Sequence, residues 1–145
     1  MSICCSKYVC RKSLKVCGFD SQSTHDVCKA TVVSRLTYAA PAWWGFTSAE
    51  DRQRLQAVLN RAIRWTLYSS ADPSIGQICR RFDEKLFSTV LNSSDHVLHS
   101  LLPPIKSTSY NLRQRAHNRE LPLKTGPFID RNFIIRMLYP NGTEY

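Results

Sequence analysis

The clearest hydrophobic pattern in the chain follows Thr47, where apolar residues recur at the three- and four-residue spacing of one helix face. These residues are Leu55, Val58, Leu59, Ala62, Ile63 and Thr66. The other side of the same helix would carry Gln53, Gln56, Asn60 and Arg64, with Arg54 and Arg61 along its edge. Thr47 and Glu50 have the spacing of a capping box. The pattern therefore predicts a helix from about Ser48 to Tyr68, with one core face and one wet, basic face.

The segment before this helix carries a second helical pattern, which a proline interrupts. After a polar turn over residues 20–23, a helix is expected from about Thr24, with its spaced positions at Val27, Cys28, Thr31, Val32, Arg35 and Leu36. Pro41 lacks an amide proton and disfavours helical dihedrals at Ala40. We therefore expect this helix to end or kink near Ala39.

Two adjacent tryptophans, Trp43 and Trp44, follow this break and are expected on a turn where Gly45 supplies backbone freedom. Neighbouring residues cannot both point the same way, so we expect one indole in the core and the other at a surface or an interface. The pair either braces a helix corner or serves in base stacking or partner contact. The sequence leaves both interpretations open.

The segments on either side of this region are also predicted to be helical. Tyr8 to Val16 reads as a short basic helix that Gly18 caps, with residues 1–5 frayed. Beyond a loop at residues 69–73, Ser74 and Gln77 repeat the capping-box spacing and begin a short helix that ends near Phe82. Asp83 is expected to cap the next helix, whose apolar face holds Leu86, Phe87, Val90 and Leu91.

Two histidines, His96 and His99, lie three residues apart in the turn from Asp95 to Leu102, a spacing that can form one edge of a metal site. Zinc needs three or four ligands, and no neighbouring residue completes a ligand spacing. We therefore assign no metal and no other cofactor to this chain. Cys28 also lacks a second ligand three or four residues further along the chain, and we therefore interpret it as a small core residue.

From Pro103 the periodicity breaks down, and prolines, serines and threonines predict an extended, irregular arm. Within it, Arg113, Arg115, His117 and Arg119 alternate and would lie on one side of an extended segment. This strip is either a solvated basic loop or a phosphate-contacting surface with Tyr110 as a stacking partner. A closing helix, with Phe128, Phe133, Ile134, Leu138 and Tyr139, is expected to fold back onto the core.

These elements predict a mainly α fold: a small helical bundle over residues 1–102, followed at 103–145 by an irregular, proline-containing basic arm with a short terminal helix. The composition agrees, because the chain has 43% hydrophobic residues, 21% charged residues and 5 glycines in 145 residues.

Charge suggests a class of partner. The formal net charge is +9, and it is concentrated at both flanks: residues 1–46 carry 6 basic and 2 acidic side chains, 47–102 carry 7 and 6, and 103–145 carry 7 and 3. A basic chain is attracted to polyanions, since each neutralised phosphate releases condensed counterions. The expected partner is therefore nucleic acid, and the candidate contact residues are Arg54, Arg61, Arg64, Tyr110, Arg113, Arg115 and Arg119, with Trp43 and Trp44 as stacking or interface residues.

The amino-acid sequence also indicates where in the cell the protein is expected. No CxxC spacing occurs among the 6 cysteines, and the first ten residues lack the apolar core of a signal peptide. No apolar run of about 20 residues is present. We therefore expect an intracellular protein, in the nucleus or the cytoplasm, with reduced thiols and no membrane partner.

Several blocks of the sequence resemble a known family. The run SRLTYAAPAWWGFTSAEDRQRLQAVLNRAIRW, followed in order by HVLHSLLPP, YNLRQRAHNRELP and RNFIIRMLY, resembles the C-terminal part of the reverse transcriptase protein of jockey-like non-LTR retrotransposons. The resemblance covers residues 8–139. It implies that residues 1–102 begin with the thumb helices, that fingers and palm precede them in a complete protein, and that Met1 is an internal or mis-called start.

The family resemblance implies an RNA-directed DNA polymerase that uses Mg²⁺, but this chain contains no pair of adjacent aspartates to hold the catalytic metal ions. Glu50 and Asp51 are adjacent, and they fit the first turn of a helix, where carboxylates favour the dipole. We therefore expect no enzyme activity from this chain, but contacts to an RNA or RNA–DNA duplex and to the palm. The alternatives are a host-retained helical protein-interaction module that binds a partner through its tryptophan surface, and a cysteine- and histidine-based metal hydrolase.

Overall fold

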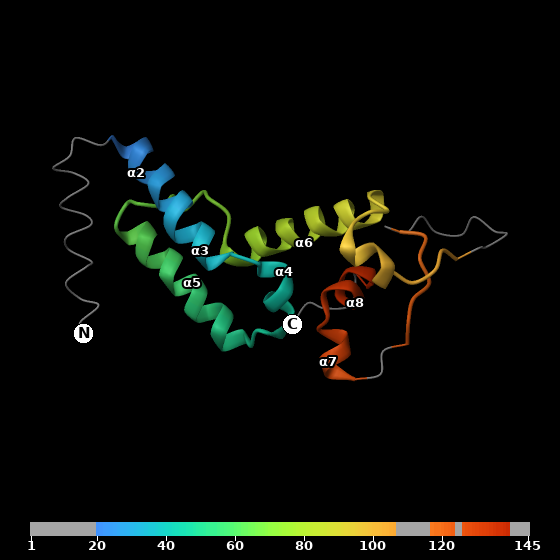
Figure 1. Cartoon of the computed structure of the whole chain (residues 1–145). Helices are drawn as coiled ribbons and strands as arrows, with labels where there is room; N and C mark the ends of the chain where they lie inside the picture. Colours follow the sequence, from blue (N-terminus) through green and yellow to red (C-terminus); the bar gives the residue numbers. More distant parts are fainter. Residues whose placement is uncertain (1–19, 107–116, 124–125, 140–145) are drawn as a thin grey trace. The chain divides into compact units, whose positions relative to one another are not determined.

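The computed structural model describes residues 20–106, 117–123 and 126–139 (Figure 1). These residues are mainly helical, which confirms the predicted fold class. Their one β pairing is an isolated antiparallel bridge between Ile105 and Arg119. The first basic helix predicted before Gly18 lies outside the described residues.

The chain divides into two compact units, which differ from the division predicted at residue 102. The first unit comprises the described part of Met1–Tyr38 together with Glu50–Ile78, and the second comprises Ala39–Ala49 together with the described part of Cys79–Tyr145. Two of the three boundaries, at residues 49/50 and 78/79, fall within helices and the third, at 38/39, falls in a turn, because the compact groups are set by packing between segments that are distant in sequence.

The first unit begins with α2 (Ser21–Cys28), three residues before the predicted start. The predicted turn at residues 20–23 is wrong because Asp20 acts as the N-cap: its carboxylate accepts a 2.6 Å hydrogen bond from the amide of Ser23. An aspartate at this position satisfies one of the amide donors that a helix start leaves unpaired.

A π-helical segment, η1 (Lys29–Val33), separates α2 from α3 (Ser34–Leu36) and changes which residues are buried. The buried positions of this segment are Cys28, Val33 and Thr37. The first two are five residues apart, instead of the three or four residues that separate positions on one face of a regular helix. Thr31 and Arg35, which a constant helical pitch predicts on the core face, are exposed. The widened turn coincides with hydroxyls that donate to carbonyls four residues earlier, as Thr31 does to Val27 at 2.6 Å, a contact that bends helices.

The central helix, α5 (Ala49–Arg64), begins one residue later than predicted. Ser48 and Asp51 therefore occupy the positions assigned to Thr47 and Glu50, while the Thr47 hydroxyl donates to the carbonyl of Trp44 at 2.7 Å. The predicted core face is correct in its centre, where Leu59 and Ala62 are buried.

Helix α5 ends four residues before the predicted Tyr68, through a left-handed Thr66 with φ 57°. The amide of Leu67 donates to the carbonyl of Ala62 at 3.0 Å, and that of Thr66 to the carbonyl of Ile63 at 2.8 Å. These two bonds form a Schellman motif, in which glycine is the usual left-handed residue. A β-branched residue in this position gave no sequence signal for the helix end.

The prediction that Gln56 lies on the wet face of α5 is wrong. Its side-chain carbonyl accepts a 3.0 Å hydrogen bond from the amide of Ile75, and its amide nitrogen donates to Asn60 at 3.0 Å. Gln56 therefore satisfies an amide at the start of the next helix, α6, and is half-buried.

Helix α6 (Ile75–Asn92) confirms one prediction and corrects another. The predicted capping box is present, because the Ser74 amide donates to Gln77 Oε1 at 2.9 Å and the Gln77 amide to Ser74 Oγ at 3.4 Å. However, the helix continues through Phe82 and Asp83 instead of breaking there. Asp83 is buried, and its carboxylate accepts a 2.8 Å bond from Arg136 rather than capping a helix.

In the second unit, α4 (Ala40–Trp43) and the 3-10 helix η2 (Trp44–Phe46) replace the predicted turn. Pro41 lies in the first turn of α4, where its missing amide proton would have had no helical partner. Ala39, directly before α4, is left-handed with φ 50°, so the helical path is interrupted there, as predicted.

Gly45 is required by space rather than by backbone freedom. A Cβ at this position would lie 2.0 Å from Arg136 Nη1 and 2.2 Å from the Arg131 carbonyl oxygen. Glycine therefore allows the Gly45 backbone to approach the C-terminal helices.

The closing helix is split into α7 (Pro127–Asp130) and α8 (Phe133–Leu138). Asn132 separates them and caps α8 by accepting from the Ile134 amide at 3.0 Å. Ile134 and Leu138 pack with Phe87 of α6 in a buried cluster, so this segment folds back onto the helical part of its own unit, as predicted.

Burial also affects the ion pair between Asp83 and Arg136. It raises the pKa of Asp83, although the Arg136 guanidinium opposes the change. Asp83 Oδ1 and Arg136 Nη1 are both buried, and neither has a hydrogen-bond partner among the described residues. The pair joins positions 53 residues apart within the second unit.

Candidate nucleic-acid interface

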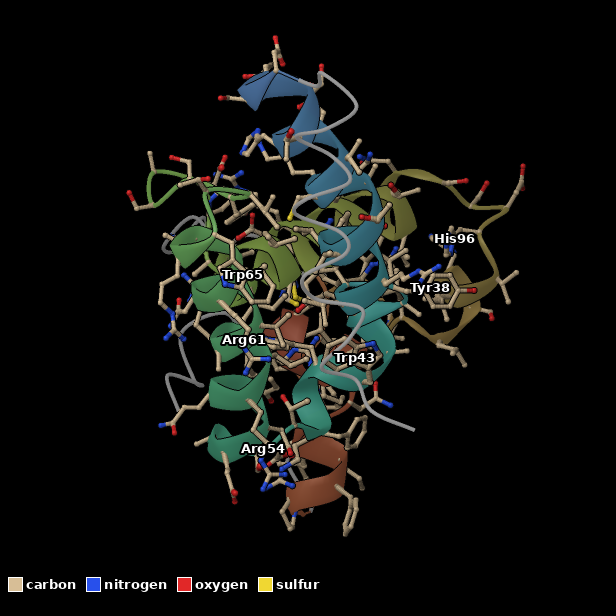
Figure 2. All side chains as sticks on the ribbon, turned by 90° about the vertical axis from the view of Figure 1, so that its left-hand side faces the viewer. Tyr38, Trp43, Arg54, Arg61, Trp65 and His96 are labelled. Carbon is tan, nitrogen blue, oxygen red and sulfur yellow. The ribbon has the colours of Figure 1, made fainter. Side chains whose placement is uncertain are left out.

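Three arginines of α5 form a cationic face on the first unit. At about 100° per residue, Arg54, Arg61 and Arg64 fall within a sector about 80° wide. All three side chains are exposed, and the small residue Ala57 lies among them. Figure 2 shows Arg54 and Arg61 one above the other along the helix. We call these three residues the α5 arginine face.

The arginines of this face differ in their partners. Arg54 contacts the Glu50 carboxylate at 2.5 Å and the Asp51 carboxylate at 3.8 Å, so its charge is partly balanced within the first turns of α5. For the guanidinium groups of Arg61 and Arg64, the described part of the chain supplies no ion-pair or hydrogen-bond partner. Their guanidinium groups can therefore bind an external anion without breaking a contact to the described residues.

Trp65 extends the α5 arginine face and was missed in the sequence analysis. Its amide donates to the carbonyls of Arg61 and Ala62, at 3.2 and 3.1 Å, so its backbone continues the helical path. The half-buried indole lies one turn beyond Arg61, on the same side of α5 (Figure 2). The four-residue spacing of Arg61 and Trp65 could have identified it. An arginine beside an indole offers both charge and a stacking surface.

The two tryptophans singled out from the sequence lie in the second unit. Trp43 and Trp44 form an edge-to-face pair, with ring centroids 5.9 Å apart and planes at 70°. Both are half-buried, so the expectation of one core and one surface indole is wrong. Because α4 and η2 are helical, Trp43 and Trp44 point in different directions around the helical path. Each indole can therefore pack against the protein along one of its edges.

Only one end of the predicted basic strip lies within the residues that the structure describes. Tyr110, Arg113 and Arg115 lie outside the described residues. Arg119 is half-buried and donates to the Pro103 carbonyl at 3.1 Å, with its other terminal nitrogen 3.3 Å from His99 Nε2. The Arg119 guanidinium therefore holds residue 119 against the η3 (Val97–Leu101) region, and the phosphate contact at Arg119 stays a prediction.

The histidines of the second unit also have internal partners. His117 Nε2 lies 3.0 Å from the Leu138 carbonyl oxygen, and His96 Nδ1 accepts from the Leu98 amide at 3.1 Å. Within residues 20–106, 117–123 and 126–139, no group of three or more His, Cys, Asp or Glu side chains is arranged to hold a metal ion.

A charged cluster in the first unit joins α2 and η1 to the loop after α5. Asp72 contacts His25 Nε2 at 2.5 Å and Lys29 Nζ at 2.9 Å, and it accepts from the Ser69 amide at 3.1 Å. Burial alone would raise the pKa of Asp72, but the hydrogen bonds from His25, Lys29 and Ser69 outweigh it and lower the pKa to about 2. Asp72 therefore remains ionised at neutral pH and fixes the loop.

Comparisons with protein-family models, with curated proteins and with solved structures found no match to this chain. Among the helices that the structure describes, none combines the length and apolar character needed to cross a membrane.

Proposed function

We propose that this chain is a non-catalytic helical part of a reverse transcriptase of the jockey-like non-LTR retrotransposon type, and that it contacts template–primer nucleic acid. The proposal rests first on the resemblance of four sequence blocks, which occur in the family's order between residues 34 and 139. The net charge of +9 supports the same class of partner.

The observation that carries the nucleic-acid role is the α5 arginine face. The side chains of Arg61 and Arg64 are exposed, their guanidinium groups have no partner in the described part of the chain, and Trp65 adjoins them. Arginine contacts phosphate oxygens in a planar, bidentate geometry, whereas an indole stacks on bases without reading their sequence. Such a surface favours binding that depends on phosphates and tolerates any sequence.

In a complete protein of this type, Mg²⁺ would be held by palm aspartates that this chain does not contain. The contribution of this chain would be to grip the duplex and to pack against the palm. We therefore propose no catalytic role for any of its residues.

Binding of the purified chain to a fluorescently labelled RNA–DNA duplex tests this function. Anisotropy titrations at several salt concentrations should give weak, sequence-tolerant binding, with log K falling linearly with log salt. A chain that binds no duplex at low salt would remove the proposal.

One observation favours the alternative of a protein-interaction module. In the second unit, the apolar side chains of Val97, Leu123 and Phe128 are 85%, 87% and 77% exposed, and a protein partner could cover them. If the chain binds no nucleic acid, and Trp44→Ala abolishes binding of a protein partner, this alternative is the better account.

A further inference from the structure

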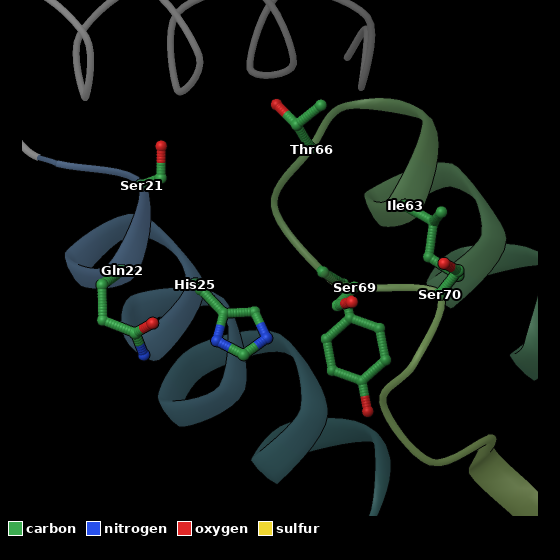
Figure 3. Close-up of a pocket in the computed structure, with 8 residues that line it drawn as sticks. Ser21, Gln22, His25, Ile63, Thr66, Ser69 and Ser70 are labelled. Carbon is green, nitrogen blue, oxygen red and sulfur yellow. The ribbon is translucent and has the colours of Figure 1, made fainter.

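The first unit contains an open cavity of about 440 Å³, within the roughly 300–1,000 Å³ range of small-molecule sites. Its lining comes from two segments that are distant in sequence. Figure 3 shows Ser21, Gln22 and His25 of α2 on one side, with Ser69 and Ser70 of the loop after α5 on the other.

The aromatic part of this cavity is held in place. The rings of His25 and Tyr68 have centroids 5.9 Å apart and planes tilted by 32°. The Tyr68 hydroxyl donates to the Pro73 carbonyl at 2.8 Å, and His25 is fixed by its contact with Asp72. Together with Ile63, these rings give the cavity an apolar wall that does not have to be ordered when a ligand enters.

The rim of the cavity is polar and uncharged. For the hydroxyls of Ser21 and Ser70, the described part of the chain supplies no hydrogen-bond partner, and both residues are exposed. The Asp72 carboxylate is engaged by His25 and Lys29. A ligand that suits this lining has a flat apolar face and an edge that both donates and accepts hydrogen bonds.

We propose that the cavity receives one unpaired nucleobase of a bound strand. A nucleobase has the required flat face and polar edge, and proteins bind unstacked bases by aromatic contact and edge hydrogen bonds. Arg64 and Trp65 lie in the chain between Ile63 and Thr66, two residues that line the cavity. One side of the cavity, from Ile63 to Ser70, therefore continues the segment that carries the proposed phosphate contacts, and α2 supplies the other side. This inference rests on the proposed nucleic-acid function and adds a base-binding site to it.

The test compares two RNA–DNA duplexes that are identical except for one unpaired 2-aminopurine, whose fluorescence rises when it leaves the base stack. We expect the parent chain to bind the bulged duplex at least about fivefold more tightly than the paired one and to raise the fluorescence. Ser70→Phe, which fills the cavity from its exposed rim, should remove both effects and leave binding to the paired duplex and its salt dependence unchanged. Ser94→Phe, at an exposed serine of the second unit, is the matched control and should retain the preference.

A second measurement needs no variant. Adenosine monophosphate in excess should lower the parent's affinity for the bulged duplex toward that for the paired duplex, and should affect the paired duplex little. Equal binding of the two duplexes by the parent, or a Ser70→Phe chain that folds and keeps the preference, would overturn the base site and leave the proposed function standing. A parent that binds neither duplex would overturn the proposed function as well.

Discussion

At the scale of single residues, Gly45 shows how one backbone position limits the second unit. A Cβ there would overlap the Arg131 carbonyl oxygen, which cannot move without shifting the chain between α7 and α8. Gly45→Ala should therefore lower the free energy of unfolding by about 2 kcal/mol or more. Gly126→Ala is the matched control, because a Cβ at Gly126 meets no atom of the described residues within 4 Å, and it should be neutral or slightly stabilising. Chemical denaturation of both variants measures the difference, and similar losses would contradict the close approach at Gly45.

Asp72 makes a pH-dependent contribution to stability. Its pKa is lowered to about 2 in the folded chain from an ordinary value of 3.8, so its ionised form favours folding. This stabilisation is present above the ordinary value and is lost as the pH falls through about 2. Asp72→Asn should accordingly be less stable than the parent at neutral pH, and the gap should close between about pH 4 and pH 2.

The control for this titration is Asp26→Asn, at an exposed carboxylate 3.8 Å from His25 Nδ1. It should change stability much less at every pH. Thermal melting across the pH range provides the measurement. A gap between parent and Asp72→Asn that stays constant down to pH 2 would show that Asp72 is not stabilised as an anion.

At the scale of elements, the core face of α5 can be tested directly. Leu59 is fully buried, and its truncation to alanine should cost about 2–5 kcal/mol. Gln53→Ala, on the exposed side, should stay within about 0.5 kcal/mol. Gln56→Ala should fall between them, because it leaves the Ile75 amide without its acceptor. Equal melting shifts for Leu59→Ala and Gln53→Ala would mean that the helix faces are assigned wrongly.

The elements that sequence reasoning predicted well are those with a local signal. The Ser74–Gln77 capping box and the Leu59–Ala62 core face depend on spacings of three residues, and both are present. The wrong predictions concern positions whose structure depends on a residue distant in the sequence or on an unusual helical turn. The widened turn η1 shifts the buried positions of the helix around Val33, and Asp83 continues α6 because Arg136 supplies its partner.

The candidate sites, too, were predictable from the sequence only where they depend on a local spacing. The α5 arginine face was predictable from the spacing of residues 54, 61 and 64 along one helix. The interior role of Arg119 was not, because it depends on the carbonyl of Pro103 and on His99. The cavity could not be found from the sequence either, since its lining combines α2 with a loop more than 40 residues later.

At the scale of the whole molecule, the first expectation concerns catalysis. The chain has no adjacent aspartates, and two-metal phosphoryl transfer requires carboxylates that converge on both ions. The purified chain should therefore incorporate no nucleotide on any primer-template, with either magnesium or manganese. Incorporation of labelled nucleotides that persists through repeated purification would contradict this expectation.

The central claim is that the chain contacts nucleic acid through α5. The most direct measurement is the salt dependence of RNA–DNA duplex binding by Arg61→Gln/Arg64→Gln, compared with Arg80→Gln/Arg81→Gln. The second pair removes the same charge from exposed positions of α6 and is the matched control. Each phosphate contact contributes about −0.9 to the slope of log K against log salt, so loss of Arg61 and Arg64 should flatten the slope by about 1.8 units. The α6 pair should change the slope much less. Equal slopes for both variants, or no change in either, would contradict binding through the α5 arginine face.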